Sequence, residues 1–228
     1  MYDKIFKRVE IKYLLDEEEK NVLFEKIKPY LEKDEYYKST IGNIYFDNKD
    51  NDLIVTSLEK PLFKEKLRVR TYKTPKENDD DVFLEIKNKY NGVVGKRRIK
   101  MNLKEYYKFL DNEEANNQIL KEIKYHIDYY KLYPKIYIAY DRYSYRGIED
   151  NNLRITFDSN LRSRRDDLKL ESGDYGELYF DNPHYIMEIK TLDSLPLWLT
   201  KILSDLKIYP KSFSKYGSIY KKECGIKC

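Results

Sequence analysis

Residues 66–72, KLRVRTY, alternate between charged and apolar side chains with little interruption. As a β-strand, this segment places Lys66, Arg68 and Arg70 on one face and Leu67 and Val69 on the other. Alone, such a strand is typical of an ordinary sheet with one solvated face. Its repetition along the chain is what constrains the fold.

The same alternation recurs in five further segments, at residues 8–13, 83–89, 96–101, 153–158 and 187–190. In each, charged residues occupy every second position and β-branched or aromatic residues fill the gaps. If these strands form a sheet that closes on itself, either the apolar or the charged faces must point inward. A dry charged interior is excluded, because each unpaired buried ion costs several kcal/mol. A cationic interior must therefore be wet or hold a polyanion.

The overall composition fits one large domain over residues 1–228. Charged residues make up 37% of the chain and aromatic residues 15%, which is typical of a globular protein and not of a disordered acidic tail. The net charge of +4, from 44 basic and 40 acidic residues, is too small to predict general attraction to nucleic acid or membranes. Any anion site must come from local arrangement, and no nucleic-acid partner is expected.

Cellular context is predicted from the cysteines and from the lack of long apolar runs. Cys224 and Cys228 are the only cysteines, and their spacing does not suggest a metal site. No segment has the length of a membrane span, and no hydrophobic signal follows the first residues. A cytoplasmic protein without a membrane segment is the expectation, and the oligomeric state stays open.

The first half of the chain reads as strands separated by one clear helix. Asp16 and Glu19 resemble a capping box that starts a helix over residues 17–33. A strand over residues 41–47 precedes an Asx-rich turn at 48–52. Residues 53–59 fit either a strand or a short helix, and residues 74–81 form a polar loop. Asn91 and Gly92 predict a tight hairpin that pairs the strands on either side of them.

The second half predicts helices, strands and one charged loop. Helices are expected over residues 103–110 and 113–133, with Pro134 ending the second. Strands are expected over 135–146 and 185–190, with a turn at 147–152. The charge run at 162–167 is expected to be a solvated loop. Asp193 or Ser194 would cap a helix that has Pro196 near its first turn and continues through residue 206, and residues 214–222 would form a last short helix. The predicted fold class is α+β, a mainly antiparallel sheet of about eight strands with helices packed outside.

Glutamates on these strands suggest a chemistry that does not involve the histidines. His126 falls in a predicted helix and His184 in a predicted loop, and the chain lacks a Walker-type phosphate loop. Glu10, Glu85 and Glu188 each precede a lysine by two residues, so each carboxylate shares a strand face with a cation. Such pairs are either intrastrand ion pairs or part of a site for a hard cation, since Mg²⁺ or Mn²⁺ takes one or two carboxylates and completes its shell with phosphate oxygens. A triphosphate would neutralise the basic side chains, and phosphoryl transfer needs mainly positioning and charge stabilisation.

Nine short motifs, in this order, resemble the VTC domain, the polyphosphate polymerase domain of the vacuolar transporter chaperone complex, within the triphosphate tunnel metalloenzymes (CYTH-like). They are residues 10–14 (EIKYL), 44–47 (IYFD), 67–72 (LRVRTY), 83–87 (FLEIK), 96–98 (KRR), 140–143 (YDRY), 154–158 (RITFD), 187–190 (MEIK) and 213–216 (FSKY). The resemblance runs nearly end to end. It implies a tunnel-shaped β-barrel whose lumen binds a triphosphate.

By motif position, the resemblance also assigns site residues. The catalytic, phosphate-binding cations would be Lys12, Arg68, Arg70, Lys87, Lys96, Arg98, Arg142, Arg154 and Lys215, with Lys66, Lys190 and Lys211 as further substrate-binding residues. Glu188 would ligate Mn²⁺ or Mg²⁺, with Glu10 and Glu85 as helpers. The family's end motif is Lys-Phe-Ser-Lys, whereas here one extra residue separates Lys211 from Lys215, which leaves the orientation of Lys211 open.

Three functions are compatible with this set of cations and glutamates. In a polyphosphate polymerase, the γ-phosphate of ATP is transferred to a growing polyphosphate chain. In a triphosphatase, water replaces the acceptor phosphate and inorganic triphosphate or a nucleoside triphosphate is hydrolysed. In a polyphosphate-binding module, the same cations bind the polyanion without catalysis. The resemblance favours the polymerase.

Overall fold

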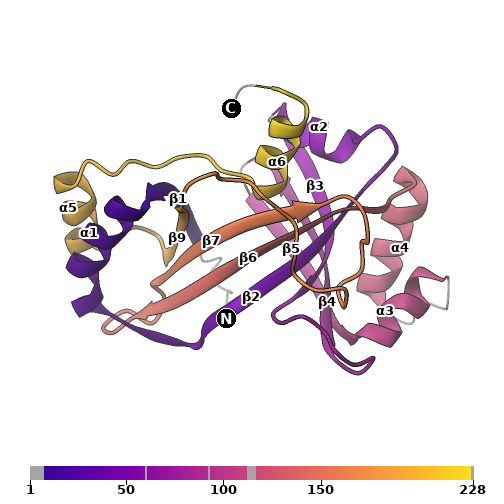
Figure 1. Cartoon of the computed structure of the whole chain (residues 1–228), viewed down its shortest axis with the longest axis horizontal. Coiled ribbons are helices and arrows are strands. Elements are labelled where there is room, and N and C mark those ends of the chain that lie inside the picture. The colour runs from indigo at the N-terminus through magenta and orange to yellow at the C-terminus, as the bar shows by residue number, and fades with distance from the viewer. Residues whose placement is uncertain (1–7, 60, 92, 112–116, 227–228) are drawn as a thin grey trace, which may run out of the picture. The chain divides into compact units, whose positions relative to one another are not determined.

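The computed structural model describes residues 8–59, 61–91, 93–111 and 117–226 (Figure 1). Within them, the strands are β1 (Arg8–Asp16), β2 (Leu31–Asp47), β3 (Phe63–Thr71), β4 (Asp81–Tyr90), β5 (Val93–Asn102), β6 (Tyr133–Gly147), β7 (Arg154–Arg164), β8 (Glu177–Leu178) and β9 (His184–Leu192). The helices are α1 (Glu17–Ile27), a 3₁₀ turn η1 (Lys28–Tyr30), α2 (Asp52–Leu58), α3 (Leu103–Leu110), α4 (Gln118–Tyr130), α5 (Leu197–Asp205) and α6 (Lys215–Glu223).

The strands pair in the order β1-β9-β7-β6-β2-β3-β4-β5, and β8 pairs with β7. The pairs β1–β9, β2–β3, β3–β4, β4–β5, β7–β8 and β7–β9 are all antiparallel. The predicted α+β class with a mainly antiparallel sheet is therefore confirmed. Nine strands form where about eight were predicted, and the two-residue β8 had no sequence signal. In this order β1 and β5 are the end strands, so the pairing of the described strands does not close.

The chain divides into two compact units. The first comprises Met1–Ser39, Tyr140–Leu161 and Phe180–Ser214, and the second comprises Thr40–Ala139, Arg162–Tyr179 and Lys215–Cys228. Each unit has its own apolar core. The prediction of a single domain over the whole chain stays a prediction.

In the first unit, the apolar faces of β1, β7 and β9 pack against α1 and α5, which lie beside each other (Figure 1). The buried core residues are Tyr13, Leu15, Leu23, Ile27, Leu31, Leu153, Ile155, Phe157, Met187, Ile189, Leu199, Leu203 and Ile208. The predicted capping box is confirmed, because the Glu19 amide donates to Asp16 Oδ1 at 2.8 Å and the Asp16 amide donates to Glu19 Oε2 at 3.0 Å. The charged residues of these strands occupy the face opposite to this core.

In the second unit, the apolar faces of β2 to β5 pack against α3 and α4 (Figure 1). Its core includes Ile44, Phe46, Leu67, Val69, Val82, Leu84, Ile86, Met101, Leu103, Tyr106, Phe109 and Ile123. The hairpin prediction is confirmed by the register of Tyr90 opposite Val93 and by the positive φ of 44° at Asn91, while Gly92 lies outside the described residues. The segment that fitted either strand or helix forms α2. As in the first unit, leucines and valines face the helices and the cations share the other face.

Several predicted boundaries were wrong. The helix predicted over residues 17–33 ends at Ile27, because Pro29 has no amide to continue the α-helical hydrogen bonds, and β2 begins at Leu31. The helix predicted over 113–133 spans Gln118–Tyr130 in the described residues, and Lys131 ends it in the left-handed conformation at φ 53°. Residues 112–116 lie outside the described residues. Pro196 is the N-cap of α5 in place of Asp193 or Ser194, and no side-chain hydrogen bond caps this helix.

The charge run at residues 162–167 was also predicted wrongly as a solvated loop. Its first part continues β7, and Arg164 is 6% exposed. The Arg164 guanidinium lies 3.7 Å from the centre of the Tyr137 ring and 4.2 Å from that of Tyr175. It also donates to the backbone carbonyls of Asp167, Lys169, Gly173 and Tyr175. Arg164 therefore anchors the segment that connects β7 to β8. The local sequence pattern did not indicate these contacts.

Two further predictions concern the ends of the chain and the membrane. Cys224 is exposed as a free thiol, and Cys228 lies outside the described residues. Among the described residues, every helix is too short or too polar to cross a membrane.

Candidate functional site

In the second unit, the predicted cations form rows across neighbouring strands. The register places Tyr45 opposite Arg68, Arg68 opposite Glu85, and Glu85 opposite Arg98. Two residues further along the strands, a second row consists of Lys66, Lys87 and Lys96. Because side chains alternate between faces, both rows lie on the same face of β3, β4 and β5. We call this set, together with Arg70 of β3, the arginine-lysine face.

Glu85 lies at the centre of the arginine-lysine face and is 1% exposed. Arg68 contacts Glu85 Oε2 through Nε at 2.8 Å and through Nη2 at 2.7 Å. Lys96 Nζ lies 2.8 Å from Glu85 Oε1, and Arg98 Nε lies 3.4 Å from the same oxygen. Burial alone would raise the pKa of Glu85, but the charges of Arg68 and Arg70, with the charge and hydrogen bond of Lys96, lower the pKa to about 2. Glu85 is therefore ionised at neutral pH and orients the cations around it.

Tyr45 and Asn43 of β2 orient the two arginines of β3. Arg68 Nη1 donates to the Tyr45 hydroxyl at 3.0 Å, and Arg70 Nε donates to Asn43 Oδ1 at 2.8 Å. Asn43 in turn donates to the Ile138 carbonyl at 3.0 Å. Burial would raise the pKa of Tyr45, but the charges of Arg68, Arg70 and Lys66 outweigh it and lower the pKa to about 8. Sequence reasoning missed both residues, although Tyr45 lies within one of the quoted motifs.

The lysine row concentrates like charges. Lys66 is the direct cross-strand neighbour of Lys87, and Lys87 that of Lys96. Like charges opposite each other destabilise a sheet. With Arg68, Arg70 and Arg98, the face holds six cations and one carboxylate, that of Glu85. An arrangement of this kind fits an anionic ligand better than it fits a purely structural role.

Lys215 is the first residue of α6, and a buried contact fixes this helix against β2. The Tyr216 hydroxyl donates to Asp47 Oδ2 at 3.1 Å, and the Tyr216 and Tyr45 rings lie 5.2 Å apart. Asp47 also accepts from the amides of Leu53 and Ile54 at the start of α2. The half-buried Lys215 therefore belongs to the same unit as the arginine-lysine face.

In the first unit, the register forms a different group. It places Lys12 opposite Glu188 and Glu188 opposite Thr156, and in the next row Glu10 opposite Lys190 and Lys190 opposite Arg154. Lys190 Nζ lies 2.6 Å from Glu188 Oε1. Lys12 Nζ lies 3.9 Å from Glu188 Oε2, 3.5 Å from Glu10 Oε1 and 3.2 Å from the Phe213 carbonyl. We call these residues, with Arg142, Asp158 and Asp34, the glutamate-lysine face.

Glu188 is ionised in these surroundings. Burial opposes ionisation, but the charges of Lys190 and Lys12, a hydrogen bond from Lys190 and the charge of Arg142 hold the pKa of Glu188 well below its usual range. Arg142 forms a two-pronged pair with Asp158, with Nε to Oδ1 at 2.6 Å and Nη2 to Oδ2 at 2.7 Å. Asp158 was quoted in a motif without being assigned a role.

Arg154 is held by two residues that sequence reasoning missed. Its Nη2 lies 2.8 Å from Asp34 Oδ2, and its Nε donates to Ser144 Oγ at 3.1 Å. Ser144 Oγ donates to Asp34 Oδ2 at 3.0 Å. Asp34 lies in a stretch where the sequence predicted only the end of a helix and a connection, so no local signal identified it.

The two faces differ in charge balance. The glutamate-lysine face pairs four cations, Lys12, Arg142, Arg154 and Lys190, with four carboxylates, Glu10, Asp34, Asp158 and Glu188. The arginine-lysine face has six cations and one carboxylate. Strong anion binding is therefore expected of the arginine-lysine face. Carboxylate oxygens that could bind a cation are found on the glutamate-lysine face.

The carboxylates differ in how well they fit a divalent metal ion. The described residues contain no group of three or more His, Cys, Asp or Glu arranged for a metal. Mg²⁺ and Mn²⁺ are commonly held by one or two carboxylates with phosphate oxygens and water, and Glu188 with Glu10 provides such a pair around one ammonium, that of Lys12. Glu85 fits less well than Glu188, because three cations lie within 3.4 Å of its two oxygens, whereas Lys190 contacts Glu188 at 2.6 Å and Lys12 lies 3.9 Å away.

Other predicted residues lie apart from these contacts. Lys211 is exposed, and its backbone amide donates to the Lys12 carbonyl at 2.8 Å, which joins the segment before α6 to β1. His126 lies in α4, with Nδ1 3.5 Å from Glu65 Oε2, and His184 begins β9 where a loop was predicted.

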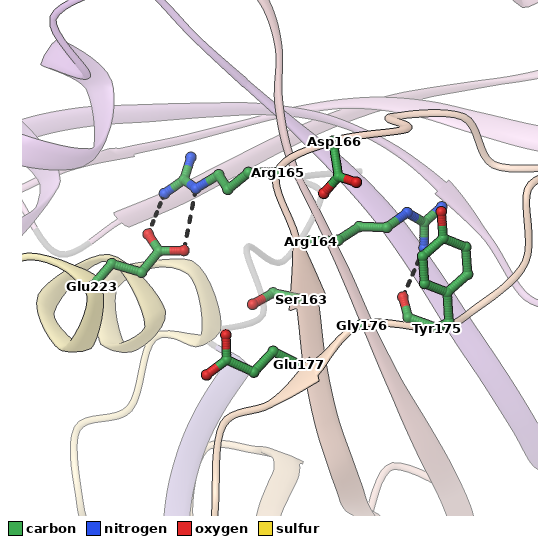
Figure 2. A pocket seen from close by; sticks show the side chains of 8 residues that line it. All are labelled: Ser163, Arg164, Arg165, Asp166, Tyr175, Gly176, Glu177 and Glu223. Carbon is green, nitrogen blue, oxygen red and sulfur yellow. Dashed lines mark hydrogen bonds and ion pairs between the residues drawn. The ribbon is translucent and has the colours of Figure 1, made fainter.

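Figure 2 shows a pocket in the second unit lined by Ser163, Arg164, Arg165, Asp166, Tyr175, Gly176, Glu177 and Glu223. None of the predicted site residues lines this pocket.

Comparison with known protein families matches residues 7–223 to the VTC domain. The chain belongs to the VTC domain family. This VTC domain is 28% identical over 222 residues to Vacuolar transporter chaperone complex subunit 4 of Trypanosoma cruzi, covering 78% of this chain and 27% of that protein. It is 26% identical over 225 residues to subunit 4 of Schizosaccharomyces pombe, covering 78% of this chain and 31% of that protein. The chain thus spans less than a third of the length of these relatives.

Solved structures support the fold of this VTC domain. A Bacillus halodurans protein, solved as a candidate adenylate cyclase, superposes with a TM-score of 0.57 at 13% identity and covers 91% of this chain and 93% of its own. A protein of Pyrococcus horikoshii gives a TM-score of 0.52 at 15% identity, with 95% and 99% coverage. Similarity at this level of identity shows the fold alone, and the tunnel-like fold predicted from the motifs is consistent with it.

Proposed function

We propose that this VTC domain is a metal-dependent polyphosphate polymerase that transfers the γ-phosphate of ATP to a polyphosphate chain. The observation that carries the proposal is the arginine-lysine face, where six cations share one strand face with one buried, ionised carboxylate. Membership of the VTC family adds to this observation. The cations of this face would bind the phosphates of ATP and of the acceptor.

Neighbouring side chains hold the two arginines of β3 in place. Arg68 uses Nε, Nη1 and Nη2 on Glu85 and Tyr45, and Arg70 uses Nε on Asn43, so both guanidinium groups are fixed before a ligand arrives. Charged hydrogen bonds of this kind contribute about 1.5 to 3 kcal/mol each. Fixed donors do not need to reorganise during the reaction, which favours stabilisation of the transition state.

A divalent metal ion, Mn²⁺ or Mg²⁺, would be held by Glu188 with help from Glu10. When bound, it would neutralise charge on phosphate oxygens and polarise the phosphoryl group. Glu85 is proposed to position Arg68, Lys96 and Arg98 and not to ligate the metal. Lys12 and Lys190 orient the Glu188 carboxylate.

The transfer itself requires no proton acceptor. A terminal oxygen of the polyphosphate chain forms a bond to the γ-phosphorus, the bond from the γ-phosphorus to the bridging oxygen breaks, and ADP leaves with the electron pair. Hydrolysis differs, because water must lose a proton. The lowered pKa values of Glu85 and Glu188 make both carboxylates weak bases, which favours phosphate over water as the acceptor.

The test is incubation of the full chain with ATP and Mn²⁺, followed by gel analysis of polyphosphate length and assay of free phosphate. Chain growth supports the polymerase. Free phosphate without chain growth would show a triphosphatase, and tight binding of tripolyphosphate without turnover would show a binding module. Arg97→Ala provides a matched control for arginine variants of the site, because Arg97 pairs with Glu122 of α4. It lies next to Arg98 on the opposite face of β5 and is expected to retain activity.

A further inference from the structure

Thr156 has a buried hydroxyl without a partner. The residue is 5% exposed, and its Oγ1 makes no hydrogen bond to any of the described residues. Buried polar groups in folded proteins are almost always hydrogen-bonded or bound to water or an ion. Three other atoms of the described residues share this condition: Asn51 Oδ1, and Glu85 Oε1 and Arg98 Nε, which lie 3.4 Å from each other in an ion pair. The hydroxyl therefore calls for a partner from outside the chain.

The position of Thr156 indicates what that partner is. The register places Thr156 of β7 directly opposite Glu188 of β9, on the face that also carries Lys12. Side chains directly opposite each other in an antiparallel pair have their Cβ atoms about 5 Å apart. Glu188 is engaged by Lys190 and Lys12 and makes no hydrogen bond with Thr156. The free hydroxyl thus lies beside the carboxylate that fits a metal best.

A phosphate is a poor candidate for this partner, because the glutamate-lysine face has no excess of cations. Four cations and four carboxylates already offset each other on the glutamate-lysine face. A hard divalent cation takes oxygen ligands, and a hydroxyl oxygen adds one without adding charge. The excess of cations that a phosphate would need is found on the arginine-lysine face instead.

We propose that Thr156 Oγ1 is a neutral oxygen ligand of the divalent metal ion bound by Glu188. The proposal rests on the proposed function in that both use the same metal. It adds Thr156 to a metal site for which sequence reasoning named only Glu188, Glu10 and Glu85. Threonine is common in strands because it is β-branched, so its presence in residues 154–158 carried no signal of its own.

The test measures binding of Mn²⁺ alone to the full chain by calorimetry, without nucleotide. Thr156→Val removes the oxygen at nearly constant volume and is expected to weaken Mn²⁺ binding about tenfold, within the range seen when groups around a metal are removed. Thr156→Ser keeps the oxygen and should bind within about threefold of the wild type. Without metal, Thr156→Val should melt at the same or a higher temperature, because a buried unpaired hydroxyl is replaced by a methyl group.

Thr191→Val is the matched control. Thr191 is 3% exposed and lies in the same unit, but its Oγ1 donates to the carbonyls of Leu192 and Ser194. This variant should lower the melting temperature and leave Mn²⁺ affinity unchanged, the reverse of the pattern expected for Thr156→Val.

Three results would overturn the proposal. They are unchanged Mn²⁺ affinity in Thr156→Val, absence of Mn²⁺ binding by the wild type, and a loss of metal-free tripolyphosphate binding in Thr156→Val as large as its loss of Mn²⁺ binding. The last result would assign the hydroxyl to a phosphate. Mn²⁺ binding without polyphosphate synthesis by the wild type would overturn the proposed function and leave the role of Thr156 standing. Polyphosphate synthesis by the wild type, together with unchanged Mn²⁺ affinity in Thr156→Val, would overturn the role of Thr156 and leave the proposed function standing.

Discussion

Replacing Glu85 by glutamine tests whether this buried carboxylate positions cations or ligates metal. Glu85→Gln keeps the shape of the side chain and removes the charge that Arg68, Lys96 and Arg98 share. The cations would then lie close together without their counter-ion. If Glu85 is a positioning residue, the main effect is on stability, and binding of Mn²⁺ is retained.

The size of the effect follows from the pKa of Glu85. The pKa falls from the ordinary value of 4.5 to about 2, which corresponds to about 3 kcal/mol of favourable interaction in the ionised form. The side chain is 1% exposed, so solvent screens this interaction little. For a chain of this length, about 3 kcal/mol lowers the melting temperature by roughly 6 to 12 °C.

Urea denaturation of the wild type and Glu85→Gln measures this loss, and its pH dependence gives a second check. Because the folded-state pKa of Glu85 is depressed, its stabilisation is fully present above the unfolded value of 4.5 and is lost as the pH falls towards 2. The difference between wild type and variant should therefore be constant from about pH 5 upwards and shrink below about pH 4.5. Calorimetry should show Mn²⁺ affinity within about threefold of the wild type. A difference in unfolding free energy under about 0.5 kcal/mol, or a tenfold loss of Mn²⁺ affinity, would refute the positioning role.

Four further substitutions test other parts of the structure. Arg70→Ala should lower kcat/KM about tenfold to hundredfold, from the loss of one or more charged hydrogen bonds to phosphate, and unchanged turnover would contradict its assignment. Glu188→Gln should weaken Mn²⁺ binding more than tenfold and tripolyphosphate binding less than threefold, and equal losses would count against a metal-ligand role. For wild type, the KM for ATP should rise between about pH 7 and about pH 9, because the Tyr45 phenol, with a pKa of about 8, becomes an anion beside Arg68, and a Tyr45→Phe profile that rises equally would exclude Tyr45 as the cause. Asp16→Ala should reduce the free energy of unfolding by about 1 kcal/mol through loss of the capping box and leave activity unchanged, whereas an unchanged denaturation curve would show that this cap contributes nothing.

The sequence predicted those features that depend on local pattern. Alternation in residues 66–72 and in the other five segments correctly separated charged from apolar faces, because the side-chain period of a strand is two. The capping box at Asp16 and the hairpin at Asn91 were predicted because each depends on neighbours a few residues away. The helix end at Ile27 differs from the prediction because the apolar period continues to Leu31, whereas Pro29 ends the α-helical hydrogen bonds before it.

Contacts between distant segments could not be predicted in this way. Asn43 reaches Arg70 across 27 positions of the chain, and Asp34 reaches Ser144 across 110. The local sequence predicts that Arg164 belongs to a solvated charge run. Its partners are the Tyr137 ring and backbone carbonyls of the segment that follows β7, and the residues beside Arg164 in the sequence do not indicate them. The assigned roles of the individual site residues stay predictions, since residue type and motif position indicate which side chains belong to a site but not how they act.

The strict period of two along β3, β4 and β5 also limits how the length of this protein can change in evolution. Inserting one residue into the paired part of β4 would exchange Glu85 and Lys87 for apolar neighbours such as Leu84 and Ile86 on one side of the insertion. Glu85 and Lys87 would then turn towards α3 and α4, so a single-codon insertion there would damage the core and the candidate site together. Insertions and deletions should instead be tolerated in the connections between strands, such as residues 74–80, where the backbone takes no part in strand pairing.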